Sequence, residues 1–355
     1  GSVDAPRAFS LKLKQLLIGK VGMSASKIDN ELLCQHSNGK LVGMMTVHVD
    51  DLKLTGEDWW IKKVLTMIQE VFGELKITWH EFTNCGIRHI QDKQTKEITL
   101  DQCDYAKTLQ SIAHPQLSSG RLTDDCSEEL HSLFRSLLGA VAYLNHTRVD
   151  IAVFVCALQR HSSQSKIEHV HKLNKLLRWI QRHPKKLAYK SFHSPGDTSG
   201  SAGKPKFSTH LRVISDAAFK KEPEDGYSLR GVVFCRCDGN MDSPKCTVHI
   251  LEWTCKAQRH VVRSTFAAEL LGATDALDQG IHISQMMFEA QCGVLSAADA
   301  RKLRLNGGFF PTAVYIDAKS VYAAATAAFV KVPAEKSLLT HVQYLREQLD
   351  LHIVD

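Results

Sequence analysis

A stretch rich in glycine, serine and proline divides this chain of 355 residues. Residues 191–208 read SFHSPGDTSGSAGKPKFS, a composition that is typical of flexible linkers. The length allows two or three domains, and 44% hydrophobic residues are enough to build a core on each side of this linker. The sequence therefore predicts folded units before residue 191 and after residue 208.

The part before the linker begins with a pattern of helices and strands. Residues 40–56, KLVGMMTVHVDDLKLTG, predict two strands that turn at Asp50 and Asp51. Adjacent acids at such a turn could hold the metals of a polymerase or could form a solvated turn. The other elements expected here are helices at 9–22 and about 58–72 and strands near 75–80 and 97–101.

Helices are expected to dominate after a polar loop or linker at 109–127. Apolar residues recur at helical steps in two series. Between the two series, Asp150 is expected to cap the start of another helix. The series are Leu130, Leu133, Leu137, Val141 and Leu144, and then Ile167, Val170, Leu173, Leu177 and Ile180. The opposite side of the helix formed by the second series carries Lys172, Lys175, Arg178 and Arg182. This basic face could follow nucleic-acid phosphates or could be a solvated helix face.

The part after the linker has a mixed α/β pattern. Strands are expected at 211–215, 229–236, near 247–254 and at 313–316, and helices at about 265–290, after 317 and near 335–350. Asp216 and Asp317 follow two of the apolar strands, and Glu269 lies beside the core stripe of the long helix. Three such carboxylates suit Mg²⁺ or Mn²⁺ and could support two-metal hydrolysis of a phosphodiester. The two aspartates could instead cap the elements that follow them.

Charge and cysteine content narrow the functional class only partly. The formal net charge of +6 suits a polyanionic partner without requiring one. No apolar run reaches the roughly 18 residues of a membrane span and no secretion signal is seen, so we expect an intracellular protein without a membrane partner. Four cysteines, Cys235, Cys237, Cys246 and Cys255, lie close in sequence, but they lack the paired C-x-x-C spacing of structural zinc sites. They could bind zinc or could be small buried hydrophobic residues.

Several short motifs follow one another along the chain in a characteristic order. The segments GSVDAPRAF (1–9) and MTVHVDDL (45–52) resemble the G-L-K-Q-A-P-R-A-W segment and the reverse transcriptase hairpin of copia-type retrotransposon Pol polyproteins. Further matches are FGELK (72–76), CGI (85–87), FRSLLGAVAYLNHTRVDIA (134–152), SDAAF (215–219), LEWTCKAQRHVVRSTFAAEL (251–270) and YIDAKSV (315–321). The resemblance covers nearly the whole chain.

The resemblance implies an α+β protein with four regions. These are a partial reverse transcriptase palm and thumb (1–115), a helical connection (116–190), a linker (191–208) and a ribonuclease H-like α/β domain with a mixed five-stranded sheet (209–355). It implies copying of RNA into DNA and hydrolysis of the RNA in an RNA–DNA hybrid. The implied metal ligands are Asp216, Glu269 and Asp317 for hydrolysis, with Asp50 and Asp51 as a partial polymerase site.

The resemblance also implies the protein's surroundings. Its partners would be RNA template, DNA, the hybrid duplex and other parts of the polyprotein, in a cytoplasmic virus-like particle or in the nucleus.

The sequence departs from the family pattern at both sites. In the family the first polymerase aspartate precedes the A-P-R-A segment and the fourth ribonuclease ligand lies in a motif that would fall beyond Asp355, so we expect both to be missing here. His48 replaces the usual aromatic residue and Asp4 the usual glutamine. Enzymatic activity therefore stays open beside two alternatives: a decayed or co-opted nucleic-acid-binding protein without catalysis, and a structural or protein-interaction module.

Overall fold

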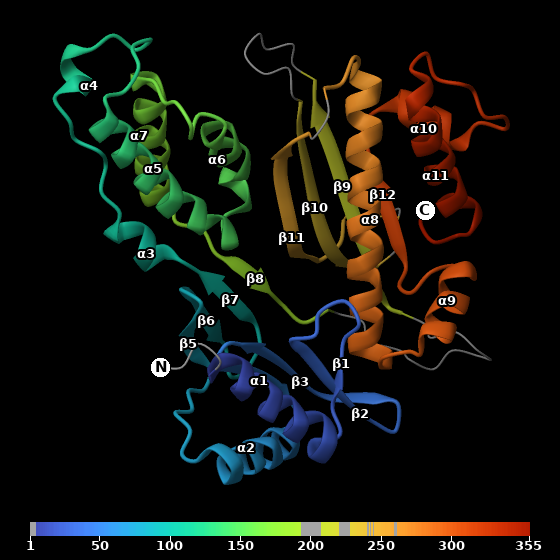
Figure 1. The fold of residues 1–355 in the computed structure, drawn as a ribbon. Helices are drawn as coiled ribbons and strands as arrows, with labels where there is room; N and C mark the ends of the chain where they lie inside the picture. Colours follow the sequence, from blue (N-terminus) through green and yellow to red (C-terminus); the bar gives the residue numbers. More distant parts are fainter. Residues whose placement is uncertain are drawn as a thin grey trace.

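The computed structural model describes residues 5–192, 207–219, 228–239, 241, 243, 245–258 and 261–355. Within them the chain forms helices and three four-stranded sheets, which confirms the predicted α+β class (Figure 1). Residues 193–206, most of the expected linker, lie outside the described part. No helix in the described ranges is both long and apolar enough to cross a membrane.

The first sheet has the order β1-β2-β3-β4 and is covered by two helices. Its elements are α1 (Ala5–Leu16), a π-helical turn (Leu17–Val21), β1 (Ser24–Ala25), β2 (Leu32–Ser37), β3 (Lys40–His48), β4 (Asp51–Gly56) and α2 (Asp58–Phe72). The Trp60 ring lies against Gly43, where an added Cβ would stand 2.2 Å from the indole. The predicted helices and hairpin of this region are confirmed, whereas β1 and β2 were not predicted.

The second sheet joins strands that are far apart in the sequence. It contains β5 (Glu81–Asn84), β6 (Ile87–Gln91), β7 (Ile98–Asp101) and β8 (Leu187–Tyr189), and β8 pairs antiparallel with β7. The strand expected near 97–101 is confirmed as β7. The strand expected near 75–80 is wrong, because those residues are irregular and their apolar side chains Ile77 and Trp79 are exposed rather than packed in a sheet.

A helical region follows β7 and is built around one hydrophobic core. Its helices are α3 (Cys103–Thr108), α4 (Gln116–Ser119), α5 (Glu128–Tyr143), α6 (Ala152–Gln159) and α7 (Ile167–Arg182). Two details of the prediction are wrong. Leu133 is exposed and Phe134 takes the core position, because the buried stripe steps from Leu130 by four residues rather than three. Asp150 does not cap α6; its carboxylate pairs with Arg148 and Lys185.

The last part packs helices against a mixed sheet of order β11-β10-β9-β12. Its strands are β9 (Thr209–Ala218), β10 (Leu229–Asp238), β11 (Val248–Ala257) and β12 (Thr312–Tyr315), and its helices are α8 (Thr265–Cys292), α9 (Ala297–Leu305), α10 (Lys319–Thr326) and α11 (Leu339–Asp350). All the elements predicted after the linker are confirmed, and α9 is additional.

The sheet of the last part has four strands in the described residues rather than the five implied by the resemblance. A further backbone segment lies beside β12, where the amide of Asp355 donates to the Thr312 carbonyl and its carbonyl accepts from the Val314 amide. These two bonds have the slanted pattern of a parallel pair. They form a single parallel bridge, too short to count as a strand.

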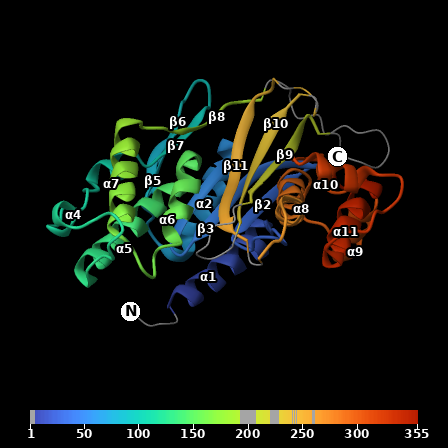
Figure 2. The same ribbon diagram turned by 90° about the horizontal axis from the view of Figure 1, so that it is seen from above.

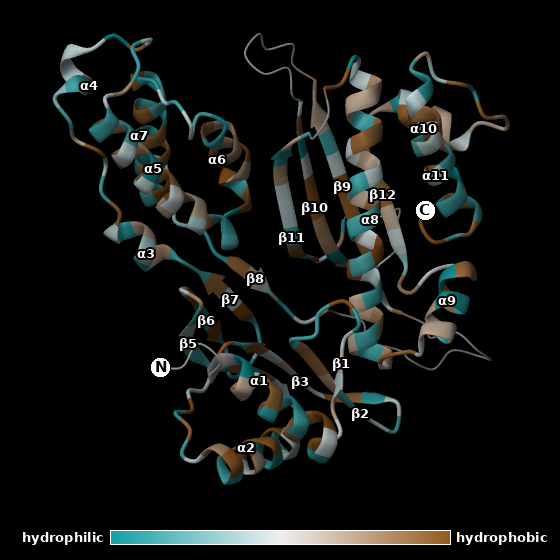
Figure 3. Ribbon diagram, viewed as in Figure 1, coloured by the Kyte–Doolittle hydropathy of each residue, from teal (hydrophilic) through white to brown (hydrophobic). Residues whose placement is uncertain are grey.

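Helix α8 contacts both the last sheet and the first one. It lies along one side of β9 and β10, whose hydrophobic colouring marks the covered strands (Figures 1 and 3). Viewed from above, α10 and α11 lie on the other side of α8 (Figure 2). Near the carboxyl end of α8, the Glu289 carboxylate accepts hydrogen bonds from Ser26 Oγ at 2.6 Å and from the Lys27 amide at 3.0 Å. The long helix thereby connects parts that stand at opposite ends of the sequence.

Candidate functional site

Three carboxylates from different elements gather at one place on the last sheet. Asp216, Glu269 and Asp317 each offer one oxygen, and these three atoms lie within 4.8 Å of one another. Asp216 and Asp317 are exposed, whereas Glu269 is only 5% exposed. The described residues contain no other group of three or more potential metal ligands as close as this one.

The register of two parallel strands brings the aspartates level. Strands β9 and β12 are parallel neighbours, with Ile214 opposite Tyr315, and continuing this register by two residues sets Asp216 opposite Asp317. The prediction that Asp216 ends its strand is wrong, because β9 continues to Ala218 and Asp216 pairs with Gly231 of β10. The Asp216 side chain still lies beside that of Asp317, which follows the last residue of β12 by two positions.

Glu269 reaches the aspartates because α8 lies close to β9. The helix begins after Ser264, whose Oγ accepts from the Ala267 amide, so Glu269 stands in its second turn. Small residues line the contact: a Cβ added to Gly272 would stand 3.5 Å from the Ala217 Cβ. Farther along, a Cβ at Gly280 would come within 2.9 Å of Val213. At Gly280 even a methyl group would push the helix away from the strand, whereas at Gly272 an added Cβ would make an ordinary contact.

Burial and like charge act together on Glu269. Burial, and after it the charges of Asp216 and Asp317, raise the pKa of Glu269 to about 7, and a hydrogen bond from the Ala217 backbone opposes the rise. A carboxyl group with this pKa is partly protonated near neutral pH. A cation at the cluster would relieve the repulsion among the three groups and would displace that proton. The donor set therefore fits a hard divalent cation.

Gln258, which was not among the predicted site residues, supports the helix that carries Glu269. Its side-chain Nε2 donates to the carbonyl of Ala268 at 2.7 Å, and its backbone amide donates to the Ser228 carbonyl at 2.7 Å. The residue follows β11 directly and is buried. It thus ties the end of the sheet to the residue before Glu269. Only the folded contact identifies this role, because a glutamine after a strand has no characteristic spacing.

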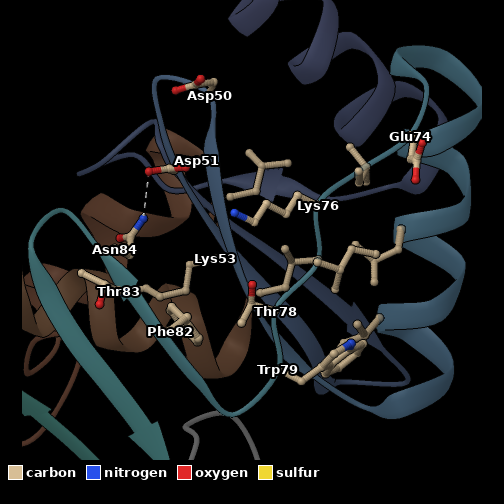
Figure 4. Close-up of a pocket in the computed structure, with 16 residues that line it drawn as sticks. Asp50, Asp51, Lys53, Glu74, Lys76, Thr78, Trp79, Phe82, Thr83 and Asn84 are labelled. Atoms are coloured by element: carbon tan, nitrogen blue, oxygen red, sulfur yellow. Dashed lines mark hydrogen bonds between the residues drawn. The ribbon is translucent and has the colours of Figure 1, made fainter.

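The other pair of predicted site residues lies at a hairpin turn. Asp50 lies in the turn between β3 and β4, where Val49 has a φ of 57°, and Asp51 is the first residue of β4; both aspartates are exposed. Asp51 accepts a hydrogen bond from Asn84 Nδ2 at 3.4 Å, while Asp50 lies at the tip (Figure 4). No third carboxylate, histidine or cysteine joins them in a ligand group among the residues that the structure describes.

A cavity of about 490 Å³ adjoins this hairpin. It lies between β4 and the irregular segment that leads from α2 to β5, and it is lined by the exposed Trp79 and by Lys53 and Lys76. Lys76 extends toward the hairpin (Figure 4). The segment that was expected to form a strand near 75–80 therefore forms a cavity wall.

Comparison with known proteins gives relatives that agree with the motifs. The chain is 26% identical over 278 residues to the retrovirus-related Pol polyprotein from transposon RE2 of Arabidopsis thaliana, and 26% identical over 286 residues to that from transposon RE1 of the same plant. The chain is a homologue of retrovirus-related Pol polyproteins. This confirms the resemblance to copia-type Pol polyproteins that the motifs indicated.

Each alignment covers 76% of this chain and 17% of the relative, so the chain spans less than a fifth of the length of these polyproteins. No family model matches the chain.

The predicted basic face of this Pol homologue is exposed on α7. Lys172, Lys175, Arg178 and Arg182 all lie on the solvent side, as their helical spacing predicts. Lys172 is neutralised by Glu168, whose carboxylate lies 2.7 Å from its Nζ. Within the described ranges, no ion pair is found for the other three residues.

An aromatic side chain extends the basic face of α7. The ring of Trp179 has Arg148 Cζ 5.5 Å and Lys185 Nζ 5.7 Å from its centroid. Cations and aromatic rings together are typical of surfaces that bind nucleic-acid strands.

The four cysteines considered for zinc do not come together as a ligand group in the part of the chain that the structure describes. Cys235 and Cys237 are buried in β10, and burial raises the pKa of both thiols. Cys255 lies elsewhere, with its thiol hydrogen-bonded to Cys156 of α6. The geometry therefore favours small buried residues for the pair in β10 and a separate role for Cys255.

Proposed function

We propose that this Pol homologue carries a ribonuclease H site formed by Asp216, Glu269 and Asp317. The observation that carries the proposal is the convergence of three carboxylate oxygens within 4.8 Å on the last sheet. The substrate would be an RNA–DNA hybrid, and the scissile bond would be a phosphodiester of its RNA strand. Mg²⁺ or Mn²⁺ bound there would polarise the phosphodiester and activate water, as in two-metal phosphoryl transfer.

The chain's own residues would prepare the site for this chemistry. Asp216 and Asp317 are exposed, so they can meet a polyanionic duplex through a shared cation without burying its phosphates. Glu269 approaches from the buried side and would lose its proton when the cation binds. Gln258 would hold the first turns of α8, and hence Glu269, against the sheet.

The fold supports the domain assignment. A mixed sheet with a long helix on one face is what a ribonuclease H-like domain at 209–355 requires, and the two backbone hydrogen bonds between Asp355 and β12 would suit a further strand at that edge. We further propose that the region up to 115 is the palm and thumb part of a reverse transcriptase, with 116–190 as its helical connection. The hairpin with Asp50 and Asp51 beside a cavity supports this proposal.

RNA-directed DNA polymerisation is proposed for the whole polyprotein, in which other parts would complete the site at Asp50 and Asp51. The partners would be RNA template, DNA and these other parts, and the place of action would be a cytoplasmic virus-like particle or the nucleus.

A second candidate function is binding of nucleic acid without catalysis. The unpaired cations of α7 and the adjacent Trp179 favour it, because they would hold a phosphate backbone whatever the state of the acidic cluster.

The test is cleavage of an RNA–DNA hybrid in Mg²⁺ or Mn²⁺, with duplex DNA and duplex RNA as comparison substrates. We expect cleavage of the RNA strand of the hybrid alone, lost in Asp216→Asn, Glu269→Gln and Asp317→Asn. Asp299→Asn, an exposed carboxylate of α9, is the matched control and should cleave normally. Binding without cleavage in either metal would reject the hydrolytic proposal and leave the second candidate.

A further inference from the structure

Two cysteines from distant parts of the sequence meet between the helical region and the last sheet. Cys156 lies in α6 and Cys255 in β11, and their side chains share a hydrogen bond. Helix α6 and strand β11 are in direct contact, and both cysteines line the same cavity at that interface. Neither thiol has a part in the proposed hydrolytic site.

A cavity gives small molecules access to this pair. Its volume is about 400 Å³, and both cysteines line it together with His146, Tyr189 and Lys256. Cys156 is 7% exposed and Cys255 is half-buried. A reagent of the size of hydrogen peroxide fits such a space easily.

The surroundings favour the thiolate form of one partner. The pKa of Cys156 is lowered to about 7 by the hydrogen bond from Cys255, with help from the charge of Arg160 and the Ala257 backbone, although burial opposes this. The same contact, together with burial, raises the pKa of Cys255. Cys255 thus keeps its proton and donates it to the Cys156 sulfur. A reactive thiolate beside a protonated thiol is the arrangement expected of an attacking cysteine and a resolving cysteine.

We propose that Cys156 and Cys255 are a redox-sensitive pair that peroxide converts into a disulfide joining α6 to β11. In the first step the Cys156 thiolate attacks hydrogen peroxide, which forms a sulfenic acid and releases hydroxide. In the second step the sulfur of Cys255 loses its proton, attacks the Cys156 sulfur and displaces the sulfenic oxygen as water. Two thiols are oxidised by two electrons, and one peroxide is reduced to two waters.

The bond would restrict how the helical region moves against the sheet. Strand β11 is paired along its length with β10, which is in turn paired with β9, the strand that carries Asp216. Helix α6 belongs to the core that also holds α7 and its basic face. Oxidation would therefore lock the basic face and the acidic cluster in one relative position, and reduction would release them.

The experiment is peroxide treatment of the folded chain, followed by alkylation of free thiols under denaturing conditions and peptide mapping without reduction. We expect a peptide that links Cys156 to Cys255, the loss of two alkylated sites, and reversal by dithiothreitol. The linked peptide should be absent in Cys156→Ser and in Cys255→Ser. Cys292→Ser, which changes a half-buried thiol of α8 distant in sequence from the pair, should still form it.

Circular dichroism of each variant checks that the fold is intact. Recovery of both residues as free thiols from folded wild-type protein, or oxidation of Cys156 to sulfinic acid with Cys255 still alkylated, would overturn the proposal. So would a linked peptide that joins either residue to a different cysteine. None of these outcomes bears on hydrolysis at the acidic cluster.

Discussion

Glu269 is the residue whose environment most clearly departs from that of an ordinary surface carboxylate. Its pKa is raised above the unfolded value by burial and by two neighbouring aspartates, so the folded chain binds more protons than the unfolded chain between pH 4.5 and about 7. By linkage, the free energy of unfolding falls as the pH rises through this window. Without metal, the ionised Glu269 therefore lowers the free energy of unfolding at pH 8.

Replacing the Glu269 carboxylate by an uncharged amide tests this destabilisation. In a chelating buffer, Glu269→Gln should raise the free energy of unfolding at pH 8 by about 1–2 kcal/mol and should leave it nearly unchanged at pH 4.5. Urea unfolding at the two pH values measures the difference. Asp299→Asn serves as the control, because it removes an exposed carboxylate outside the cluster. A variant that is equally or more destabilised at pH 8 than at pH 4.5 would contradict the account.

At this scale the sequence could predict the charged residues but not their supporting contacts. Asp216, Glu269 and Asp317 could be found because each follows or lies within a strongly patterned strand or helix. Gln258 could not be found, because its role depends on a hydrogen bond to Ala268 across the fold. The contact between Cys156 and Cys255 was missed for the same reason, since Cys255 was considered only together with the three cysteines close to it in sequence.

Helix α7 is the element whose function can be tested by charge alone. Replacing Arg178 and Arg182 by glutamine should lower the affinity for an RNA–DNA hybrid and reduce the slope of log affinity against log salt by about 1 per residue. Lys172→Gln is the matched control, because the charge of Lys172 is already balanced by Glu168. Fluorescence anisotropy from low to moderate salt measures both quantities. An unchanged slope in the double variant would show that this face does not contact phosphates.

Long, strongly patterned elements were the predictable ones. Helices α2, α7 and α8 and strands β9 and β10 were expected close to their observed bounds, because each buries a continuous apolar face. Short elements were missed: β5 and β6 form a small hairpin of mixed polarity, and β8 has three residues that pair with β7. Strand β8 could not be expected, since its pairing depends on a partner far away in the sequence.

At the scale of the whole molecule, α8 is the connection between distant parts. Glu269 stands near its beginning, and Glu289 near its end is 2% exposed and bonded to Ser26 and Lys27 of the first region. The sequence predicted the helix but not this docking, because neither the serine nor the glutamate belongs to a motif. The expected domain boundaries stay predictions, since the main linker falls largely outside the described residues.

Removing the serine hydroxyl tests the connection. Ser26→Ala leaves the buried Glu289 carboxylate without one of its donors, so it should lower the free energy of unfolding by about 1–3 kcal/mol. Ser337→Ala, which removes an exposed hydrogen bond to Glu335 two residues away, should change it by less than about 0.5 kcal/mol. Urea unfolding of both variants gives the comparison. Equal effects would mean that the contact of α8 with the first region adds nothing to stability.

The central claim is that Asp216, Glu269 and Asp317 act together as one cation site, and Mn²⁺ titration at pH 8 tests it most directly. Electron paramagnetic resonance reports free Mn²⁺, and Asp51→Asn shows any contribution from the hairpin. We predict that Asp216→Asn, Glu269→Gln and Asp317→Asn each weaken binding at least about tenfold, while Asp51→Asn and Asp299→Asn do not. Equal affinity in the wild type and in all three cluster variants would contradict the account.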